Sequence, residues 1–302
     1  MHREGRIELK AASPTLIKGT IMGRNFDLKW LKKQAADEES KQWISKINEW
    51  RNFVFEKNEF IKSQQLFSIN LGKYQLWFRA FGAFSSIEVY VEIFKDDVHF
   101  LVPEFSGKSA NLIVDIGANQ GFYTLKIKEH NPKCKIICVE PNPYVFEMLK
   151  KNIEANHLKD VVLVNKAVGS SNGEITFEII KEIGPIGGKS LRIGDRQWLK
   201  DEFIEKIDVD AVTLDTLCRE SDISNIDILK IDAEGMEMDI LENSRAPLTR
   251  VDKIVVERHS RKLRDEVVAL LTDNHFDLVF EEDPEFKRYY GDMYFINKNK
   301  RE

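Results

Sequence analysis

The sequence predicts an α/β fold built on a mostly parallel sheet that is flanked by helices. Three observations support this class. Strand-like and helix-like segments alternate from residue 111 onward, as in repeated strand–helix–strand units. A buried strand at 111–116 opens through two glycines into a helix, and the next strand ends in a lone acid, Glu140. This combination is typical of an open parallel sheet that binds a nucleoside.

Before residue 111 the sequence predicts an N-terminal region. Residues 1–25 contain scattered glycines and a proline and should be irregular. Tryptophans and aliphatic residues recur at spacings near 3.6 over 26–61, which predicts amphipathic helix. We therefore divide the chain into a helical appendage, 1–65, and a main domain, 66–302. The appendage either packs on the core or contacts an acceptor molecule or a second copy of the chain.

The main domain should begin with a hairpin over 66–81, centred on Asn70-Leu-Gly72, and a short helix over 86–95. The alternating elements then follow in order. They are strands near 111–116, 135–139, 161–166, 226–231 and 253–257, and helices near 121–130, 143–155, from 235 and 260–273.

Three further segments complete the pattern. Residues 174–180 and 207–213 are expected to be strands that add to the sheet. The glycine-rich stretch 184–198 between them is either a lid over a ligand site or an irregular surface loop. Residues 276–280 and 293–296 should form a closing antiparallel hairpin.

Composition limits the class of protein. The 302 residues suffice for one large α/β domain, with or without a smaller appendage. Hydrophobic content of 42% and charged content of 31% are ordinary for a folded globular protein. A net charge of −5 does not favour wholesale binding of nucleic acid, and no apolar run approaches the ~18 residues of a membrane span. Three cysteines without C-x-x-C spacing fit the reducing cytoplasm.

The glycine turn separates two classes of ligand. A dinucleotide fingerprint is G-x-G-x-x-G, but the run Gly117-Ala-Asn-Gln-Gly121 is G-x-x-x-G. Asn119 and Phe122 occupy the places of the second and third glycines, where side chains would crowd a pyrophosphate. S-adenosylmethionine has a ribose and an adenine but no pyrophosphate. We therefore expect this cofactor rather than NAD, the alternative being a tight turn needed for packing only.

Two acids frame the expected cofactor site. Asp115, before the turn, would receive the ammonium group of the methionine tail directly or through water, and Glu140 would accept hydrogen bonds from the ribose diol. The full predicted set of cofactor-binding residues is Asp115, Gly117, Ala118, Asn119, Gly121, Phe122, Glu140, Pro141, Asn142, Asn165, Ala167 and Asp232.

Four strand ends finish in an acid, namely Asp115, Glu140, Asp232 and Glu257. In open α/β sheets ligands bind beyond the carboxyl ends of the strands, so these acids should share one rim. Each also has a structural interpretation. Asp232 would cap a helix, Glu234 and Glu237 would be first-turn acids favoured by the helix dipole, and Lys230 would be a surface lysine.

Several motifs together resemble the FkbM family of S-adenosylmethionine-dependent methyltransferases, over roughly residues 84–300. They are Val114-Asp-Ile-Gly-Ala-Asn-Gln-Gly121, Val139-Glu-Pro-Asn-Pro143, Asn152 with Asn156, Val212-Thr-Leu-Asp-Thr216, Leu229-Lys-Ile-Asp-Ala-Glu-Gly-Met-Glu237 and Ile254-Val-Val-Glu257. The resemblance implies a Rossmann-like class I methyltransferase fold with a mostly parallel seven-stranded sheet. It also implies methylation of a hydroxyl oxygen, often on a sugar or a natural product.

Methyl transfer to a hydroxyl requires a group that orients the acceptor or removes its proton. The candidates are His259, Asp232, Glu234 and Glu257, with His259 as the expected proton acceptor. These residues would also suit a divalent ion, but no spacing matches a known metal signature, so no metal site is predicted.

Other functions remain open at this point. One is a nucleic-acid (RNA) methyltransferase, because a basic stretch lies over 245–264, although acids interrupt it. The others are an NAD-dependent oxidoreductase and a non-catalytic cofactor-binding module. The expected partner is a small-molecule hydroxyl acceptor rather than nucleic acid, and a homo-oligomer is open.

Overall fold

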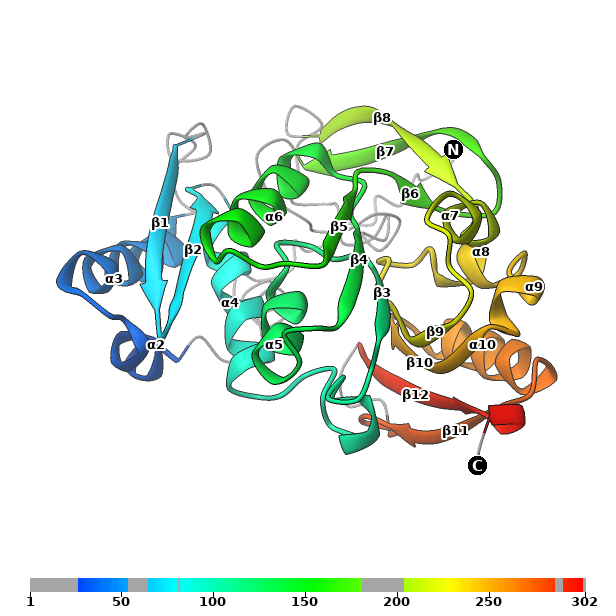
Figure 1. Cartoon of the computed structure of the whole chain (residues 1–302). Helices are drawn as coiled ribbons and strands as arrows, with labels where there is room; N and C mark the ends of the chain where they lie inside the picture. The colour runs from blue at the N-terminus through cyan, green and yellow to red at the C-terminus, as the bar shows by residue number, and fades with distance from the viewer. Residues whose placement is uncertain (1–26, 54–64, 81, 181–203, 286–289, 301–302) are drawn as a thin grey trace, which may run out of the picture.

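The structure is a computed structural model that describes residues 27–53, 65–80, 82–180, 204–285 and 290–300 (Figure 1). The irregular segment expected over 1–25 and the candidate lid at 184–198 lie outside these residues. Among the described residues, no helix is both long and apolar enough to cross a membrane.

A seven-stranded sheet forms the centre of the molecule, with the strand order β11-β12-β10-β9-β3-β4-β5. The neighbours from β10 to β5 pair in parallel, and β12 runs antiparallel to both β10 and β11. The predicted mostly parallel sheet and its closing hairpin are therefore confirmed. The strands are β3 (Leu112–Ile116), β4 (Lys135–Val139), β5 (Val161–Val164), β9 (Ile226–Ile231), β10 (Val251–Arg258), β11 (Phe276–Glu281) and β12 (Gly291–Asn297).

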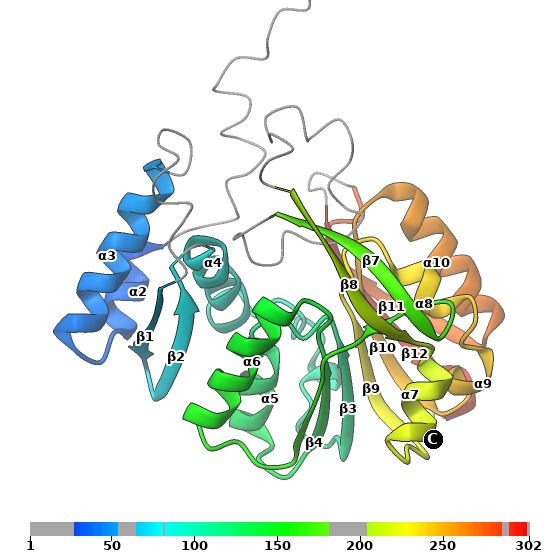
Figure 2. The ribbon, with the colours of Figure 1, turned by 90° about the horizontal axis from the view of Figure 1, so that it is seen from above.

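Helices cover both faces of this sheet (Figure 2). On one face lie α4 (Ala83–Phe94), α5 (Phe122–His130) and α6 (Pro143–Ala155); on the other lie α7 (Leu214–Glu220), α8 (Glu237–Leu241) and α10 (Arg261–Asp273), with the short α9 (Arg245–Leu248) beside them. Alternate residues of a central strand therefore enter two different cores. Ile113 belongs to the cluster under α5, whereas Val114 belongs to the cluster under α10. Burial on both faces explains why these strands are almost wholly apolar.

A second, three-stranded sheet has the order β6-β8-β7 and consists of β6 (Ala167–Val168), β7 (Gly173–Ile180) and β8 (Ile204–Val212). The expectation that 174–180 and 207–213 would add to the main sheet is thus wrong, although both are strands. The expected strand 161–166 ends early, at Val164. The side chain of Asn165 then donates to the carbonyl oxygens of Glu140 and Pro141, and the chain leaves the main sheet there.

In the described part of the N-terminal region, residues 27–53, the predicted helical pattern forms two helices, α2 (Leu28–Gln34) and α3 (Glu38–Phe53). Asp27 caps α2 by accepting from the backbone N–H of Trp30, and Asp37 does the same for Ser40 at the start of α3. Between them Ala35 is extended and forms a bridge with Leu71. The helical pattern is therefore broken by a contact with the hairpin.

The predicted hairpin is confirmed as β1 (Leu66–Leu71) and β2 (Tyr74–Arg79), and it lies between α3 and the helices α4 and α6 (Figure 1). One hydrophobic core runs through all of these elements. It contains Leu31 and Ile44 of the appendage as well as Leu125 and Ile136 of the main domain. The division at residue 65 stays a prediction, and this shared core shows that the described part of the appendage packs on the domain.

Candidate functional site

The glycine turn connects β3 to α5 at the carboxyl edge of the sheet. Gly117 and Gly121 have φ angles of +78° and +83°, a conformation that favours glycine. A Cβ atom on Gly117 would lie 1.8 Å from the carbonyl oxygen of Asp232, and one on Gly121 would lie 2.7 Å from the side chain of Leu149. Close packing against the backbone therefore requires a glycine at 117, whereas the positive φ favours one at 121. This packing places the turn directly against the end of β9.

Glu140 follows β4 and faces the same turn. Its Oε2 accepts from the backbone N–H of Asn119 at 3.0 Å, and its Oε1 accepts from that of Asn142 at 2.9 Å. Burial raises the pKa of Glu140 to about 7, against the two N–H donors, which lower it. Each carboxylate oxygen keeps one lone pair beyond these bonds. The geometry thus leaves Glu140 able to accept from a diol, as the sequence predicts.

Asp115 and Lys230 lie opposite one another in the register of β3 and β9. The Lys230 Nζ is 3.2 Å from Oδ1 of Asp115 and 3.5 Å from Oδ2 of Asp232. Asp115 is fully buried and Lys230 nearly so, which makes the interpretation of Lys230 as a surface lysine wrong. Burial raises the pKa of Asp115, and the Lys230 charge opposes that shift. The ammonium group beside Asp115 is thus that of Lys230, and the expected contact of Asp115 with the cofactor tail, directly or through water, stays a prediction.

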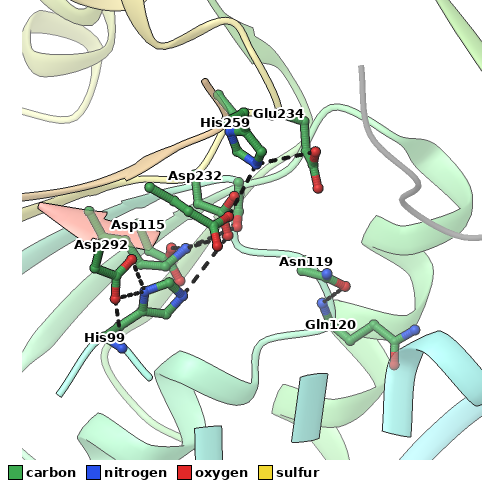
Figure 3. A network of polar contacts seen from close by, with 12 residues as sticks. His99, Asp115, Asn119, Gln120, Asp232, Glu234, His259 and Asp292 are labelled. Carbon is green, nitrogen blue, oxygen red and sulfur yellow. Dashed lines mark hydrogen bonds and ion pairs between the residues drawn. The ribbon is translucent and has the colours of Figure 1, made fainter. Parts of the chain in front are cut away.

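The four predicted catalytic residues meet beyond the ends of β9 and β10. The His259 Nε2 is 3.2 Å from Oε2 of Glu257 and 3.4 Å from Oε2 of Glu234. One side-chain atom each of Asp232, Glu257 and His259 lies within 4.8 Å of the other two. Figure 3 shows His259 and Glu234 turned toward each other, with Asp232 beside them and Asn119 on the facing loop. The shared rim expected from the strand ends is present.

The charge of His259 is set by these neighbours. Burial lowers its pKa, but Glu237, whose Oε1 is 3.3 Å from the Nδ1, and Glu257 together raise it well above the ordinary value. Burial and the charge of Asp232 raise the pKa of Glu257 to about 8. The carboxylates around His259 therefore favour its protonated form, and its expected role as the proton acceptor stays a prediction.

Two residues of the network lie outside every sequence motif, His99 and Asp292. The His99 Nδ1 is 2.9 Å from Oδ2 of Asp292, and its backbone N–H donates to the same oxygen at 2.9 Å. The Nε2 of His99 faces Oδ2 of Asp232 at 4.0 Å (Figure 3). Burial lowers the pKa of His99, but Asp292 raises it above the ordinary value. No local pattern marks this pair, whereas Lys230 stands out only as a charged residue in a mostly apolar strand.

Three members of the predicted cofactor set, Ala118, Phe122 and Ala167, are buried core residues. Phe122 is buried, with its ring centroid 5.8 Å from that of Tyr90 and 6.3 Å from that of Phe78. Ala167 is buried against Val209 in the small sheet. Any contact of Phe122 with a cofactor would come from its backbone N–H at the start of α5.

Part of the basic stretch at 245–264 is paired within the protein. Arg258 is fully buried and its Nη2 donates to the carbonyl oxygens of Glu282 and Asp283. Arg264 pairs with Glu281 and Asp265, and Lys262 pairs with Glu266. With these three side chains paired, the stretch adds little support to the nucleic-acid alternative, which is not favoured.

Comparison with known proteins agrees with this geometry. Residues 115–288, more than half of the chain, match the model of the methyltransferase FkbM domain. The methyltransferase sdnD of Sordaria araneosa is 28% identical over 229 residues, which are 66% of this chain and 86% of that protein. The 2-O-methyltransferase NoeI of Sinorhizobium fredii is 27% identical, over 55% of this chain and 70% of that protein. The 31-O-demethyl-FK506 methyltransferase FkbM of Streptomyces tacrolimicus is 27% identical, over 66% and 84% respectively.

The family match begins at Asp115 and extends beyond His259, so it covers the glycine turn, Glu140 and the acid cluster together. The strand order and the helices on both faces are those of a Rossmann-like sheet. Because the family match covers more than half of the chain, the chain belongs to the FkbM family of methyltransferases.

Proposed function

We propose that the protein uses S-adenosylmethionine to methylate a hydroxyl oxygen on a sugar or a natural-product-like small molecule. The observation that supports this cofactor over a dinucleotide is the hydrogen bonding of the glycine turn. The N–H groups of Gly117 and Ala118 donate to the carbonyl oxygen of Val139, and that of Gly121 donates to Ala118. The N–H group of Asn119 donates to the side chain of Glu140, and that of Gln120 donates to the side chain of Asn119.

All five N–H groups from 117 to 121 therefore have partners within the protein. A pyrophosphate at the start of a helix is held by free backbone N–H groups, and this turn offers it none of these five. A ligand without phosphate does not need free N–H groups at this turn. The carboxylate of Glu140, with one lone pair left on each oxygen, suits the ribose diol of such a ligand.

The charge of the rim also suits this cofactor. Asp232, Glu234 and Glu257 stand at the carboxyl edge, and Lys230 is shared between Asp115 and Asp232. Acidic residues outnumber basic ones at this edge even when His259 is counted, which favours a ligand that carries a sulfonium and an ammonium group.

The acceptor class is supported by the relatives. Their names describe a 2-O-methyltransferase, a 31-O-demethyl-FK506 methyltransferase and a hexuronic acid methyltransferase. The first two modify oxygen by name, and the third acts on a sugar acid. We extend this class, a hydroxylated small molecule, to the present chain.

In this proposal the bound cofactor supplies an electrophilic methyl group, and its sulfur keeps the electron pair of the broken bond. The chain must hold the acceptor oxygen in line with that methyl group and receive the hydroxyl proton. We assign these tasks to Asp232, Glu234, Glu257 and His259 as a group, because they converge at the edge where open sheets bind ligands.

Isothermal titration calorimetry with S-adenosylhomocysteine and with NAD tests the cofactor. We expect S-adenosylhomocysteine to bind and NAD not to. Glu140→Ala should weaken binding by roughly tenfold to a hundredfold, because it removes a charged acceptor worth about 1.5–3 kcal/mol. Glu154→Ala, on the exposed side of α6, is the control and should bind as the wild type does. Tight NAD binding, or a folded Glu140→Ala variant with unchanged affinity, would overturn the assignment.

A further inference from the structure

The cluster at the ends of β9 and β10 has the dimensions of a metal-ligand shell. The nearest side-chain atoms of Asp232, Glu257 and His259 all lie within 4.8 Å of one another, and His259 Nε2 and Glu257 Oε2 are 3.2 Å apart. Ligands at about 2.1 Å from an octahedral ion lie about 3 Å apart when adjacent and about 4.2 Å apart when opposite. The three side chains need little movement to share one ion.

His259 is oriented as a metal-ligating histidine is. Its Nδ1 lies 3.3 Å from Oε1 of Glu237, a fully buried carboxylate that is itself held by the N–H groups of Ala233 and Gly235 at 3.2 and 3.0 Å. Metal-bound histidines commonly turn their second ring nitrogen to a carboxylate in this way. The arrangement directs Nε2 toward Glu257 and Glu234. It is independent of the acidic cluster itself.

More hydrogen-bond acceptors surround the Nε2 of His259 than its single hydrogen can bond to. The oxygens of Glu257 and Glu234 lie 3.2 and 3.4 Å from it, and Asp232 completes the group. A ring nitrogen carries at most one hydrogen, which points at one acceptor. A dication in front of Nε2 would contact the nitrogen and the surrounding carboxylates at once.

We propose that Asp232, Glu257 and His259 bind one divalent cation, with Glu234 as a further oxygen ligand and Glu237 as the residue that orients His259. Three carboxylates suit Mn²⁺, and the added imidazole favours such a transition-metal ion over Mg²⁺. Under the proposed function, on which this part rests, the ion would lower the pKa of an acceptor hydroxyl, and a carboxylate oxygen of the cluster that does not coordinate the ion would receive the proton. The inference extends the sequence-based expectation, which contained no metal site.

The test uses the full chain after dialysis against EDTA, with Mn²⁺ alone as the probe. Electron paramagnetic resonance of free Mn²⁺ should show saturable binding of one ion per chain. His259→Gln and Asp232→Asn should each weaken it at least tenfold, and Glu237→Gln should weaken it about tenfold through the orientation of His259. His130→Gln is the matched control, because this exposed histidine ends α5 at the opposite edge of the sheet.

Circular dichroism melting identifies any variant that fails to fold, and the remaining variants then decide. Absence of saturable Mn²⁺ binding to the wild type, or equal binding by the wild type and the folded cluster variants, overturns the proposal. Because this titration contains neither cofactor nor acceptor, its failure is distinct from failure of the proposed function. The latter is measured separately by S-adenosylhomocysteine binding to the EDTA-treated protein.

Discussion

The side-chain amide of Asn152 donates to the carbonyl oxygen of Gln120 at 2.9 Å, which joins α6 to the glycine turn. The same fully buried side chain accepts from the backbone N–H of Trp77 in β2 at 2.6 Å. A single residue thus connects the N-terminal hairpin to the loop that carries Asn119 and Gln120. The hairpin supports the candidate cofactor site through this residue.

Asn152→Ala should therefore lower both stability and cofactor affinity. It leaves a buried donor and a buried acceptor without their partner, which costs about 1–3 kcal/mol of the free energy of unfolding in urea. We also expect the Kd for S-adenosylhomocysteine, measured by calorimetry, to be several-fold higher. Asn156→Ala is the control, because Asn156 bonds to Gln75 of the hairpin but has no bond to the turn. If both variants lose affinity equally, the coupling through Asn152 is wrong.

A second prediction concerns the buried pair of Asp115 and Lys230. Lys230→Met removes the cation between Asp115 and Asp232 and leaves a fully buried carboxylate uncompensated. Breaking such a pair costs about 3–5 kcal/mol, which urea unfolding at pH 7 would detect. The double variant Asp115→Asn with Lys230→Met should recover part of that loss.

Lys166→Met is the matched control for this pair, because Lys166 bonds to Glu220 at the surface at 3.2 Å. Exposed pairs contribute at most about 1 kcal/mol. A Lys230→Met protein as stable as the Lys166→Met protein would show that the buried pair is not required for the fold.

The parts of the site that follow from local pattern could be predicted from the sequence. Alternating strands and helices imply a parallel sheet, and the carboxyl ends of parallel strands meet at one edge. This reasoning brings Asp232 and Glu257 together although they are far apart in the chain. It also places Glu140 near the glycine turn, where it accepts from Asn119.

The remaining features depend on contacts between distant segments. His99 and Asp292 are 193 residues apart in the chain, in a loop and in a closing strand, and neither belongs to a motif. The sheet that β7 joins could not be predicted either, because strand propensity identifies a strand but not the strand it pairs with. Lys230 looks like a surface residue until the register with Asp115 is known. These contacts are set by packing rather than by residue spacing.

The last prediction concerns the pH dependence of cofactor binding. Glu140 has a pKa of about 7, raised by burial from the ordinary value of 4.5, so it is half protonated near neutral pH. A ribose diol donates hydrogen bonds and therefore favours the carboxylate. Affinity for S-adenosylhomocysteine should rise from pH 6 to pH 8, with most of the change below pH 7. In Glu140→Gln, which cannot ionise, calorimetry should show weaker binding with a flatter pH profile.

The same pKa sets the sign of a stability effect. An acid whose pKa is raised in the folded state binds its proton more tightly there than in the unfolded chain, so its contribution to stability is lost as pH rises from about 4.5 to about 7. The wild type should therefore lose more free energy of unfolding than Glu140→Gln does across this range. Because the cofactor binds the ionised form, saturating S-adenosylhomocysteine should lower the pKa of Glu140 and reduce the difference. If wild type and Glu140→Gln show parallel pH profiles for both affinity and stability, Glu140 does not titrate in this range and its role as the diol acceptor loses its electrostatic basis.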